Sequence, residues 1–173
     1  MGDLTVRPVT VDDLDAVNAI YNHWIRVSSA NFYTDDISAD ERQGWYDALD
    51  GRRYRAFVAV ADGAVVGFAY TGKVRPRAAY DTSVEVTVYV ADGCTRGGIG
   101  SALYDALFAA IAGEDIHRLY AVITVPNDAS VALHERFGFR LAGLFSEQGR
   151  KFGRYWDVGW YERAWPPADP ATL

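Results

Sequence analysis

Several residue types that anchor common kinds of site are scarce in this chain. One cysteine, Cys94, stands among 173 residues, so an intramolecular disulfide is excluded and no cluster of thiolates is available for a metal. His23, Asp81 and His117 do not have the spacing of a metal-binding helix pair, so we expect no metal site. The G-x-S-x-G turn of serine hydrolases is also missing, which argues against a Ser-His-Asp hydrolase.

Excess basic charge and long apolar runs are missing as well. Lys and Arg number 17 against 23 Asp and Glu, and the resulting net charge of −6 argues against a nucleic-acid partner held by bulk electrostatics. No uninterrupted apolar run reaches membrane-spanning length, and Met1 to Leu4 do not begin a secretory signal. We therefore expect a cytoplasmic protein with no membrane and no nucleic-acid partner.

The composition is that of a globular domain. Half of the residues are hydrophobic and 14% are aromatic, enough for a substantial core at this length. No internal repeat or linker interrupts the chain, so we predict one domain over residues 1–165. The segment 166–173 is rich in proline, and we expect it to be a frayed tail.

Hydrophobic periodicity predicts an α+β fold with a mainly antiparallel sheet and helices on its faces. A helix capped by Thr10 or Asp12 is expected first, and Ser38 with Glu41 forms a capping box. Asp62-Gly63 is typical of a hairpin turn. The predicted strands cover residues 4–9, 54–61, 64–72, 83–90, 117–125, 139–145 and 155–164. The later helices are predicted at 38–49, 102–112 and 127–137.

A glycine-rich turn over Thr95–Ser101 follows the strand 83–90 and opens the next helix. Free backbone N–H groups at the positive end of a helix dipole form an anion site suited to phosphate. No lysine follows the glycines as in a P-loop, and the dinucleotide fingerprint lacks its third glycine and its acidic residue. The remaining alternatives are another phosphate carrier and an ordinary tight turn.

The surrounding order of elements resembles the GNAT superfamily of N-acetyltransferases. These enzymes bind acetyl-CoA with a Q/R-x-x-G-x-G/A loop after the fourth strand, and an Asn-headed helix after the fifth strand ends in a Gly-Phe or Gly-Tyr turn. Here Thr95 takes the first motif position, Asn127 heads the later helix, and Phe137-Gly138-Phe139 ends it. The resemblance implies a six- to seven-stranded mixed sheet with about four helices and with the fourth and fifth strands splayed.

Within the superfamily, blocks spread from about residue 5 to 164 resemble phosphinothricin N-acetyltransferases, a family that includes enzymes acting on methionine sulfoximine and methionine sulfone. These blocks are Asn22–Ile25, Ser29–Phe32, Ala79–Asp81, Glu85–Val90, Pro126–Val131 and Lys151–Gly159. The resemblance implies acetyl transfer from acetyl-CoA to the α-amino group of a small amino-acid-like substrate, directly within a ternary complex. It also implies a homodimer.

The resemblance also assigns roles to individual residues. Glu85 matches the general base. Acetyl-CoA would contact the strand at Val88, Tyr89 and Val90, next to a bulge that splays the strands. The phosphates would rest on Arg96, Gly97, Gly98, Ile99, Gly100 and Ser101, and the cofactor arm on Asn127 and Ser130. His134 and Tyr104 match catalytic positions, and His134 could protonate the thiolate or shape the site. Phe32, Arg75, Arg77 and Tyr80 match substrate-binding positions.

Other interpretations remain open from the residues. Glu85 could be a surface carboxylate, Tyr104 a core aromatic, and the basic loop with Arg75 and Arg77 a solvated hairpin tip. A peptide N-terminus or a polyamine could be the acceptor, although the arginines near the cleft argue against a cationic one. A non-catalytic acyl-CoA-binding module is the remaining alternative, against which the pairing of Glu85 with His134 argues.

Overall fold

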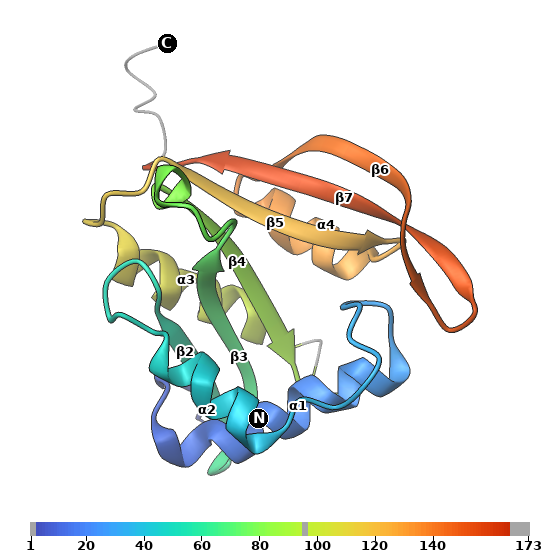
Figure 1. Ribbon diagram of the computed structural model, residues 1–173. Coiled ribbons are helices and arrows are strands. Elements are labelled where there is room, and N and C mark those ends of the chain that lie inside the picture. Colours follow the sequence, from blue (N-terminus) through green and yellow to red (C-terminus); the bar gives the residue numbers. More distant parts are fainter. Residues whose placement is uncertain (1–2, 95–96, 167–173) are drawn as a thin grey trace.

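In the computed structural model, which describes residues 3–94 and 97–166, seven strands form one mixed sheet in the order β1-β2-β3-β4-β5-β7-β6 (Figure 1). The strands are β1 (Thr5–Pro8), β2 (Ala56–Ala61), β3 (Ala64–Lys73), β4 (Ser83–Val90), β5 (Arg118–Val125), β6 (Arg140–Lys151) and β7 (Arg154–Ala164). The helices are α1 (Leu14–Val27), α2 (Ala39–Asp47), α3 (Ile99–Ile111) and α4 (Asp128–Arg136), with short 3-10 turns η1 (Val11–Asp13) and η2 (Ala78–Tyr80).

The predicted caps and turns form as the local sequence dictates. Ser38 accepts a hydrogen bond from the backbone N–H of Glu41, whose carboxylate accepts in return from Ser38 N–H, so the capping box starts α2. Thr10 caps η1, which leads directly into α1. Asp62 and Gly63 both have positive φ, as a two-residue hairpin turn requires.

The sheet opens between β4 and β5, as the resemblance implies. These two strands are parallel and pair only from Ser83 to Glu85, opposite Arg118 to Tyr120. Beyond Glu85, β4 stays with β3 while β5 stays with β7 along its whole length, so the two halves of the sheet diverge (Figure 1). The predicted bulge is wrong for this pairing, because the β3–β4 register is continuous from Val84 to Val90.

Helices cover both faces of the sheet and enclose two cores. α3 packs on one face with the inward residues of β4 and β5, among them Val84 and Leu119. α1 packs on the other face with Val58 and Phe68, and the aromatic side chains of α2 join this second core. Successive side chains of β4 alternate between the two faces, so Glu85 lies on the α1–α2 face.

The last hairpin is longer than predicted. We expected its first strand to end at Phe145, but β6 continues to Lys151 and pairs again with β7 after a register shift between Phe145 and Gly149. Glu147 has a positive φ within this irregularity, and its N–H donates to the Asp157 carboxylate. The segment lacks apolar alternation because it is an exposed edge, which is why periodicity missed it.

Two further features of the chain bear on earlier expectations. No helix within the described ranges is long and apolar enough to cross a membrane. The predicted proline-rich tail lies outside the described residues except for Pro166.

Candidate active site

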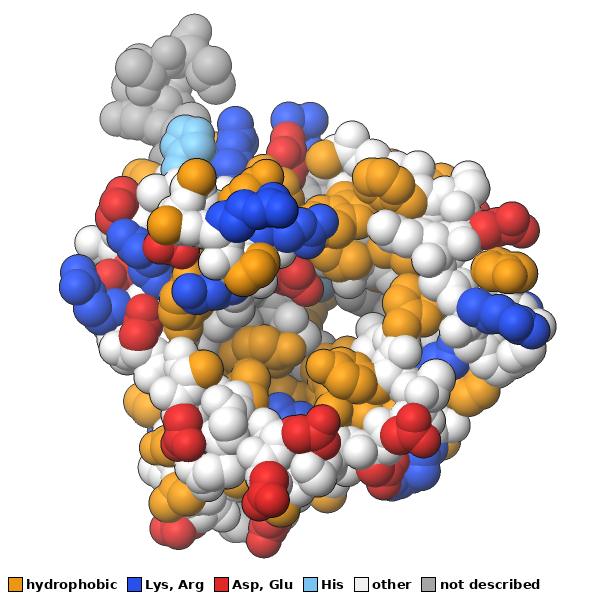
Figure 2. Space-filling model, viewed as in Figure 1, with side chains coloured by type: hydrophobic (Ala, Val, Ile, Leu, Met, Phe, Trp, Pro, Cys, Tyr) orange, Lys and Arg blue, Asp and Glu red, His pale blue; other side chains and the backbone are white. Residues whose placement is uncertain are grey.

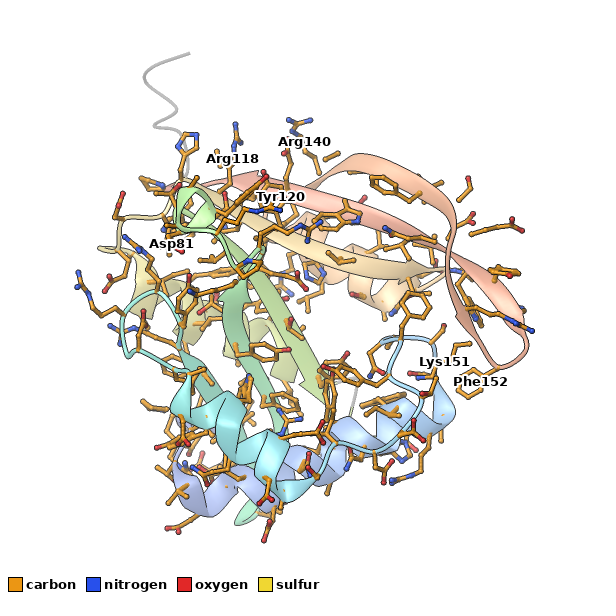
Figure 3. All side chains as sticks on the ribbon, in the orientation of Figure 1. Asp81, Arg118, Tyr120, Arg140, Lys151 and Phe152 are labelled. Atoms are coloured by element: carbon orange, nitrogen blue, oxygen red, sulfur yellow. The ribbon has the colours of Figure 1, made fainter. Side chains whose placement is uncertain are left out.

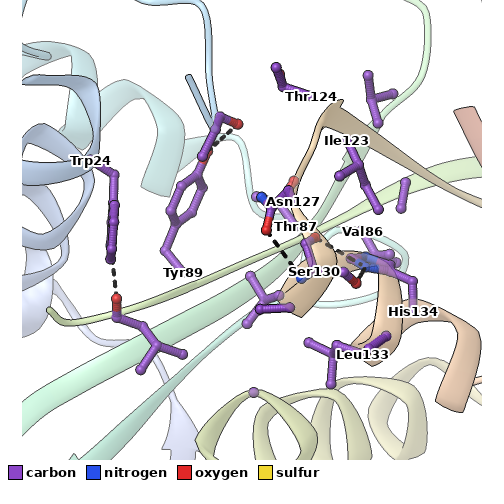
Figure 4. Close-up of a pocket in the computed structure, with 18 of the residues that line it drawn as sticks. Trp24, Val86, Thr87, Tyr89, Ile123, Thr124, Asn127, Ser130, Leu133 and His134 are labelled. Carbon is purple, nitrogen blue, oxygen red and sulfur yellow. Dashed lines mark hydrogen bonds between the residues drawn. The ribbon is translucent and has the colours of Figure 1, made fainter. Parts of the chain in front are cut away.

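A cavity of about 640 Å³ occupies the opening between β4 and β5 (Figure 4). Its walls come from both diverging strands, the start of α3, and α4. Most residues predicted to bind the cofactor line this cavity: Val88, Tyr89, Val90, Gly98, Ile99, Gly100, Ser101, Asn127 and Ser130. Gly97 is not among the lining residues, and Arg96 lies outside the described part of the chain.

The start of α3 is shaped to receive an anion. Gly98 precedes the helix with φ of 73°, a left-handed conformation that a residue with a Cβ adopts only with strain. No acidic side chain lies in the first turn of α3, so its free N–H groups face the cavity without a competing carboxylate. Gly100 keeps α3 close to α4, because an added Cβ would lie 3.1 Å from Leu133 Cδ2.

The open edge of β4 offers unpaired backbone groups. Ala91 N–H donates to Val66 O of the neighbouring β3. Val90 O, on the opposite side of β4, accepts a hydrogen bond from Trp24 Nε1–H at 2.8 Å (Figure 4). Adjacent residues of an antiparallel strand point their backbone groups in opposite directions. The N–H and C=O groups of Val88 therefore point away from β3, toward the opening. Trp24 was missed from sequence, because its helical spacing indicates only a core residue.

Glu85 is half-buried on β4, at the last position where β4 and β5 still pair. Burial raises the pKa of its carboxyl above the ordinary value, and the nearby Arg75 guanidinium opposes that rise. Thr87 and Tyr89 share its face of the strand and line the cavity. A carboxylate with a raised pKa at the edge of a cleft is suited to accept a proton near neutral pH.

His134 lines the cavity, and Tyr104 lies behind it. The imidazole Nδ1 lies 2.7 Å from the backbone oxygen of Ser130, which can only accept, so Nδ1 carries a proton (Figure 4). The Tyr104 hydroxyl lies 2.8 Å from Nε2 and is fully buried. Burial lowers the pKa of His134, which favours the neutral ring, so Tyr104 donates to Nε2. Both ring nitrogens are thereby occupied.

The predicted substrate residues are only partly brought together. Arg75 stacks over the Trp160 ring, with its Cζ 5.6 Å from the ring centroid, and is close enough to Glu85 to influence its pKa. Arg77 and Tyr80 flank the same bend at η2, and both are exposed.

The segment between α1 and α2 carries Phe32 to the other side of the site. Its ring rests on the backbone of Gly149 in β6, where an added Cβ would lie 2.2 Å from Phe32 Cζ. Lys151, near the tip of the β6–β7 hairpin, donates from Nζ to Asn31 O at 3.0 Å and so ties this segment to the hairpin (Figure 3). Figure 2 shows the resulting face, with hydrophobic side chains gathered around a central hollow.

These features fit acetyl-CoA. The N-terminus of α3 suits the pyrophosphate, and an unpaired strand edge suits the amides of the pantetheine arm. No group of three or more His, Cys, Asp or Glu in the described ranges is placed to hold a metal ion.

Comparison with known proteins agrees with this geometry. Residues 6–160 match the family model described as an acetyltransferase (GNAT) domain. The chain is 47% identical over 164 residues to a phosphinothricin N-acetyltransferase of Streptomyces coelicolor, covering 93% of this chain and 96% of that protein. It is 35% identical over 155 residues to an L-methionine sulfoximine/L-methionine sulfone acetyltransferase of Pseudomonas paraeruginosa, covering 89% and 90%.

A solved structure extends the comparison to the fold. The crystal structure of a GNAT superfamily phosphinothricin acetyltransferase from Sinorhizobium meliloti, in complex with acetyl-CoA, superposes with a TM-score of 0.90 at 30% identity. The match covers 98% of this chain and 92% of that one. The chain therefore belongs to the GNAT family and is an acetyl-CoA-dependent N-acetyltransferase.

Proposed function

We propose that this enzyme acetylates the α-amino group of a small amino-acid-like acceptor of the phosphinothricin, methionine sulfoximine or methionine sulfone type, directly within a ternary complex. The observation that carries the proposal is the position of Glu85. Its half-buried carboxylate lies where the sheet opens, with the cofactor cavity beyond it and the Arg75 guanidinium close by. The names of the relatives support the class of acceptor.

The described residues that would hold the cofactor are those of the cavity wall. Gly98 to Ser101 would hold the phosphates with their backbone N–H groups, and Asn127 and Ser130 would contact the cofactor arm. Acetyl-CoA would supply the thioester: the acceptor nitrogen would bond to its carbonyl carbon as the C–S bond breaks, and coenzyme A would leave as the thiolate, which takes up the second proton that the nitrogen loses. The Asn127 side chain is fixed in position because it caps α4: its Oδ1 accepts a hydrogen bond from Ser130 N–H at 3.2 Å. Cys94 has no part in direct transfer, so C94A should keep its activity.

Glu85 prepares the acceptor. An ammonium group has no free electron pair, so it must lose a proton before it forms a bond to carbon. We assign that proton to the Glu85 carboxylate, reached directly or through one water. The raised pKa makes the carboxylate a stronger base than an exposed glutamate. A general base of this kind contributes roughly 10²–10⁴-fold to the rate.

The open edge of β4 is suited to stabilise the negative charge that forms on the acyl oxygen during transfer. The Val88 N–H is a fixed donor that points into the opening, and it would stabilise the negative charge that develops on the acyl oxygen of a bound thioester. His134 serves as a fixed wall of the cavity, because neither nitrogen of its neutral ring is left to donate toward the thiolate. Of the two roles that the sequence left open for His134, we therefore propose the shaping one.

Acceptor recognition rests on cations and an aromatic side chain. The guanidinium of Arg75 is placed to bind an acidic group beside the amine, and Arg77 and Tyr80 extend the same polar bend. Phe32 covers the apolar part of the acceptor from the opposite side. An arginine-lined site of this kind disfavours a polyamine, whose own positive charges would be repelled.

We also propose that the enzyme is a homodimer joined through the β6–β7 hairpin. Large apolar side chains are exposed on this hairpin: Leu141, Leu144, Phe145, Phe152 and Tyr155. Figure 3 shows Phe152 at the hairpin tip. Several large apolar side chains exposed on one hairpin favour an interaction surface there. Light scattering after size-exclusion chromatography should give twice the monomer mass, and a single-chain mass would contradict this.

A thiol-release assay with acetyl-CoA tests the proposed function. The acceptor panel contains phosphinothricin, methionine sulfoximine, methionine sulfone, a polyamine and a short peptide, with product masses recorded. Selective turnover of one or more of the amino-acid-like acceptors supports the proposal. Turnover confined to the polyamine or the peptide would overturn the acceptor class, and no turnover of any amine would overturn the proposal as a whole.

A further inference from the structure

A second, smaller cavity lies under the aromatic residues of the α1–α2 face. It has a volume of about 260 Å³ and is lined by Tyr21, Tyr33, Ile37, Glu41, Arg42, Trp45 and Tyr70. Among these side chains Arg42 is the one cation, and it is 4% exposed. Neither the resemblance nor the proposed function assigns this residue a role.

The Arg42 guanidinium is buried with few polar partners. Nε donates to Asn18 Oδ1 at 3.2 Å, and Cζ lies 4.9 Å from the ring centroids of both Tyr21 and Trp45. Within residues 3–94 and 97–166, neither terminal nitrogen makes a hydrogen bond and no carboxylate lies within 4 Å. A buried cation without a counter-charge is costly, and aromatic faces offset only part of that cost.

The one carboxylate in the cavity lining does not serve as the counter-ion. Glu41 is exposed, and its Oε2 accepts hydrogen bonds from both the N–H and the hydroxyl of Ser38. This capping box directs the carboxylate to the start of α2. The two terminal nitrogens of Arg42 are thus left to donate to an external anion.

The cavity adjoins the acceptor side of the active site. Tyr70, which lines it, lies opposite Thr87, and Glu85 lies two residues further along β4 on the same face, a spacing of about 7 Å. The Tyr21 ring, another part of the lining, contacts the Tyr89 ring at 4.9 Å between centroids. Tyr89 in turn lines the cofactor cavity.

We propose that the Arg42 cavity is the part of the acceptor site that binds a second oxyanion, the acidic end of the acceptor side chain. This inference rests on the proposed function. In an α-amino acid the carboxylate and the amine are bonded to the same carbon, so Arg75, which lies near Glu85, takes the carboxylate. The tail of the acceptor then extends past Tyr70, and its phosphinate or similar group pairs with the two terminal nitrogens of Arg42.

The test compares two acceptors that differ in the charge of the tail. Phosphinothricin ends in an anionic phosphinate, and methionine sulfone ends in a neutral sulfone. R42Q should raise the KM for phosphinothricin by roughly tenfold or more, the usual scale for a lost charge-assisted hydrogen bond. The KM values for methionine sulfone and acetyl-CoA should stay near wild type. R52Q removes an exposed arginine elsewhere and should change none of these constants.

Three outcomes would overturn the inference. They are an unchanged KM for phosphinothricin in R42Q, an equal rise for both acceptors, and the same rise in R52Q. If R42Q does not fold, R42K is the alternative, because it keeps the positive charge but loses the forked pair of guanidinium nitrogens. Calorimetric titration of R42K with phosphinothricin should show binding weakened several-fold. Wild-type affinity would overturn the inference. A wild-type enzyme inactive on every amino acid would instead reject the proposed function.

Discussion

The hydroxyl of Tyr104 donates to Nε2 of His134 at 2.8 Å, and this bond is sealed inside the core between α3 and α4. On the other side of the ring, Nδ1 donates to the backbone of Ser130. The imidazole is therefore held in one tautomer and one orientation at the cavity wall. The ring forms a fixed part of the cavity wall, and its pair of hydrogen bonds explains why a histidine tolerates this burial.

Removing the Tyr104 hydroxyl should lower the stability of the folded protein more than it lowers the catalytic rate. Y104F leaves Nε2 of His134 without its donor, so we expect the free energy of unfolding to fall by about 1–2 kcal/mol. Urea denaturation measures this loss, and kcat should stay within about threefold of wild type. A fall in kcat of roughly 100-fold at unchanged stability would show that Tyr104 acts in the chemistry.

Adding a methyl group at Gly149 should disturb acceptor binding alone. The new Cβ would lie 2.2 Å from Phe32 Cζ, so the ring must leave its place over the site in G149A. We expect a higher KM for the acceptor and an unchanged KM for acetyl-CoA, measured in the thiol-release assay. G44A is the control, because Gly44 has no atom within 4 Å of an added Cβ. Equal constants for G149A and wild type would contradict the role of Phe32.

Gly98 offers the complementary test on the cofactor side. Its φ of 73° is strained for alanine by roughly 1–2 kcal/mol, so G98A should shift the start of α3 away from its anion-binding conformation. The expected result is weaker acetyl-CoA binding by calorimetry, with no change in the acceptor KM. G113A, at a glycine with open space around it, serves as the control. Wild-type affinity for acetyl-CoA in G98A would count against this site.

The raised pKa of Glu85 predicts a stability effect of definite sign. The folded state binds this proton more tightly than the unfolded chain does. The free energy of unfolding of the wild type therefore falls as the pH rises through the window from the ordinary pKa of glutamate to the raised pKa of the folded state. Below that window both states are protonated and the cost vanishes. E85Q should therefore be more stable than wild type at neutral pH, and the difference should shrink as the pH falls through this window and become constant below about 4.3. Thermal unfolding across pH measures it, and a constant difference would reject the burial argument.

Much of the fold, and the positions of several residues of the candidate cofactor site, could be predicted from local patterns. Alternation along β4 puts Glu85, Thr87 and Tyr89 on one face, and the glycine turn marks the start of α3, because both effects act over a few residues. The predicted boundaries of β4 agree with the structure.

Contacts between distant segments could not be predicted in the same way. Phe32 meets Gly149 across 117 positions, and neither position carries a local pattern that indicates the other. Arg42 lies on a helix of low amphipathicity, so periodicity does not indicate that its guanidinium is buried. The edge strand β6 lacks a buried face to impose alternation, and its extension to Lys151 was missed for that reason.

The pH dependence of kcat/KM for the amino-acid acceptor, in wild type and E85Q, tests the central claim most directly. With Glu85 as the base, the wild-type profile should fall on the acid side with a pKa above that of an ordinary glutamate. E85Q should lose roughly 10²–10⁴-fold at neutral pH and lack this acid limb. Equal rates for the two enzymes, or the same acid limb in E85Q, would contradict the assignment of Glu85.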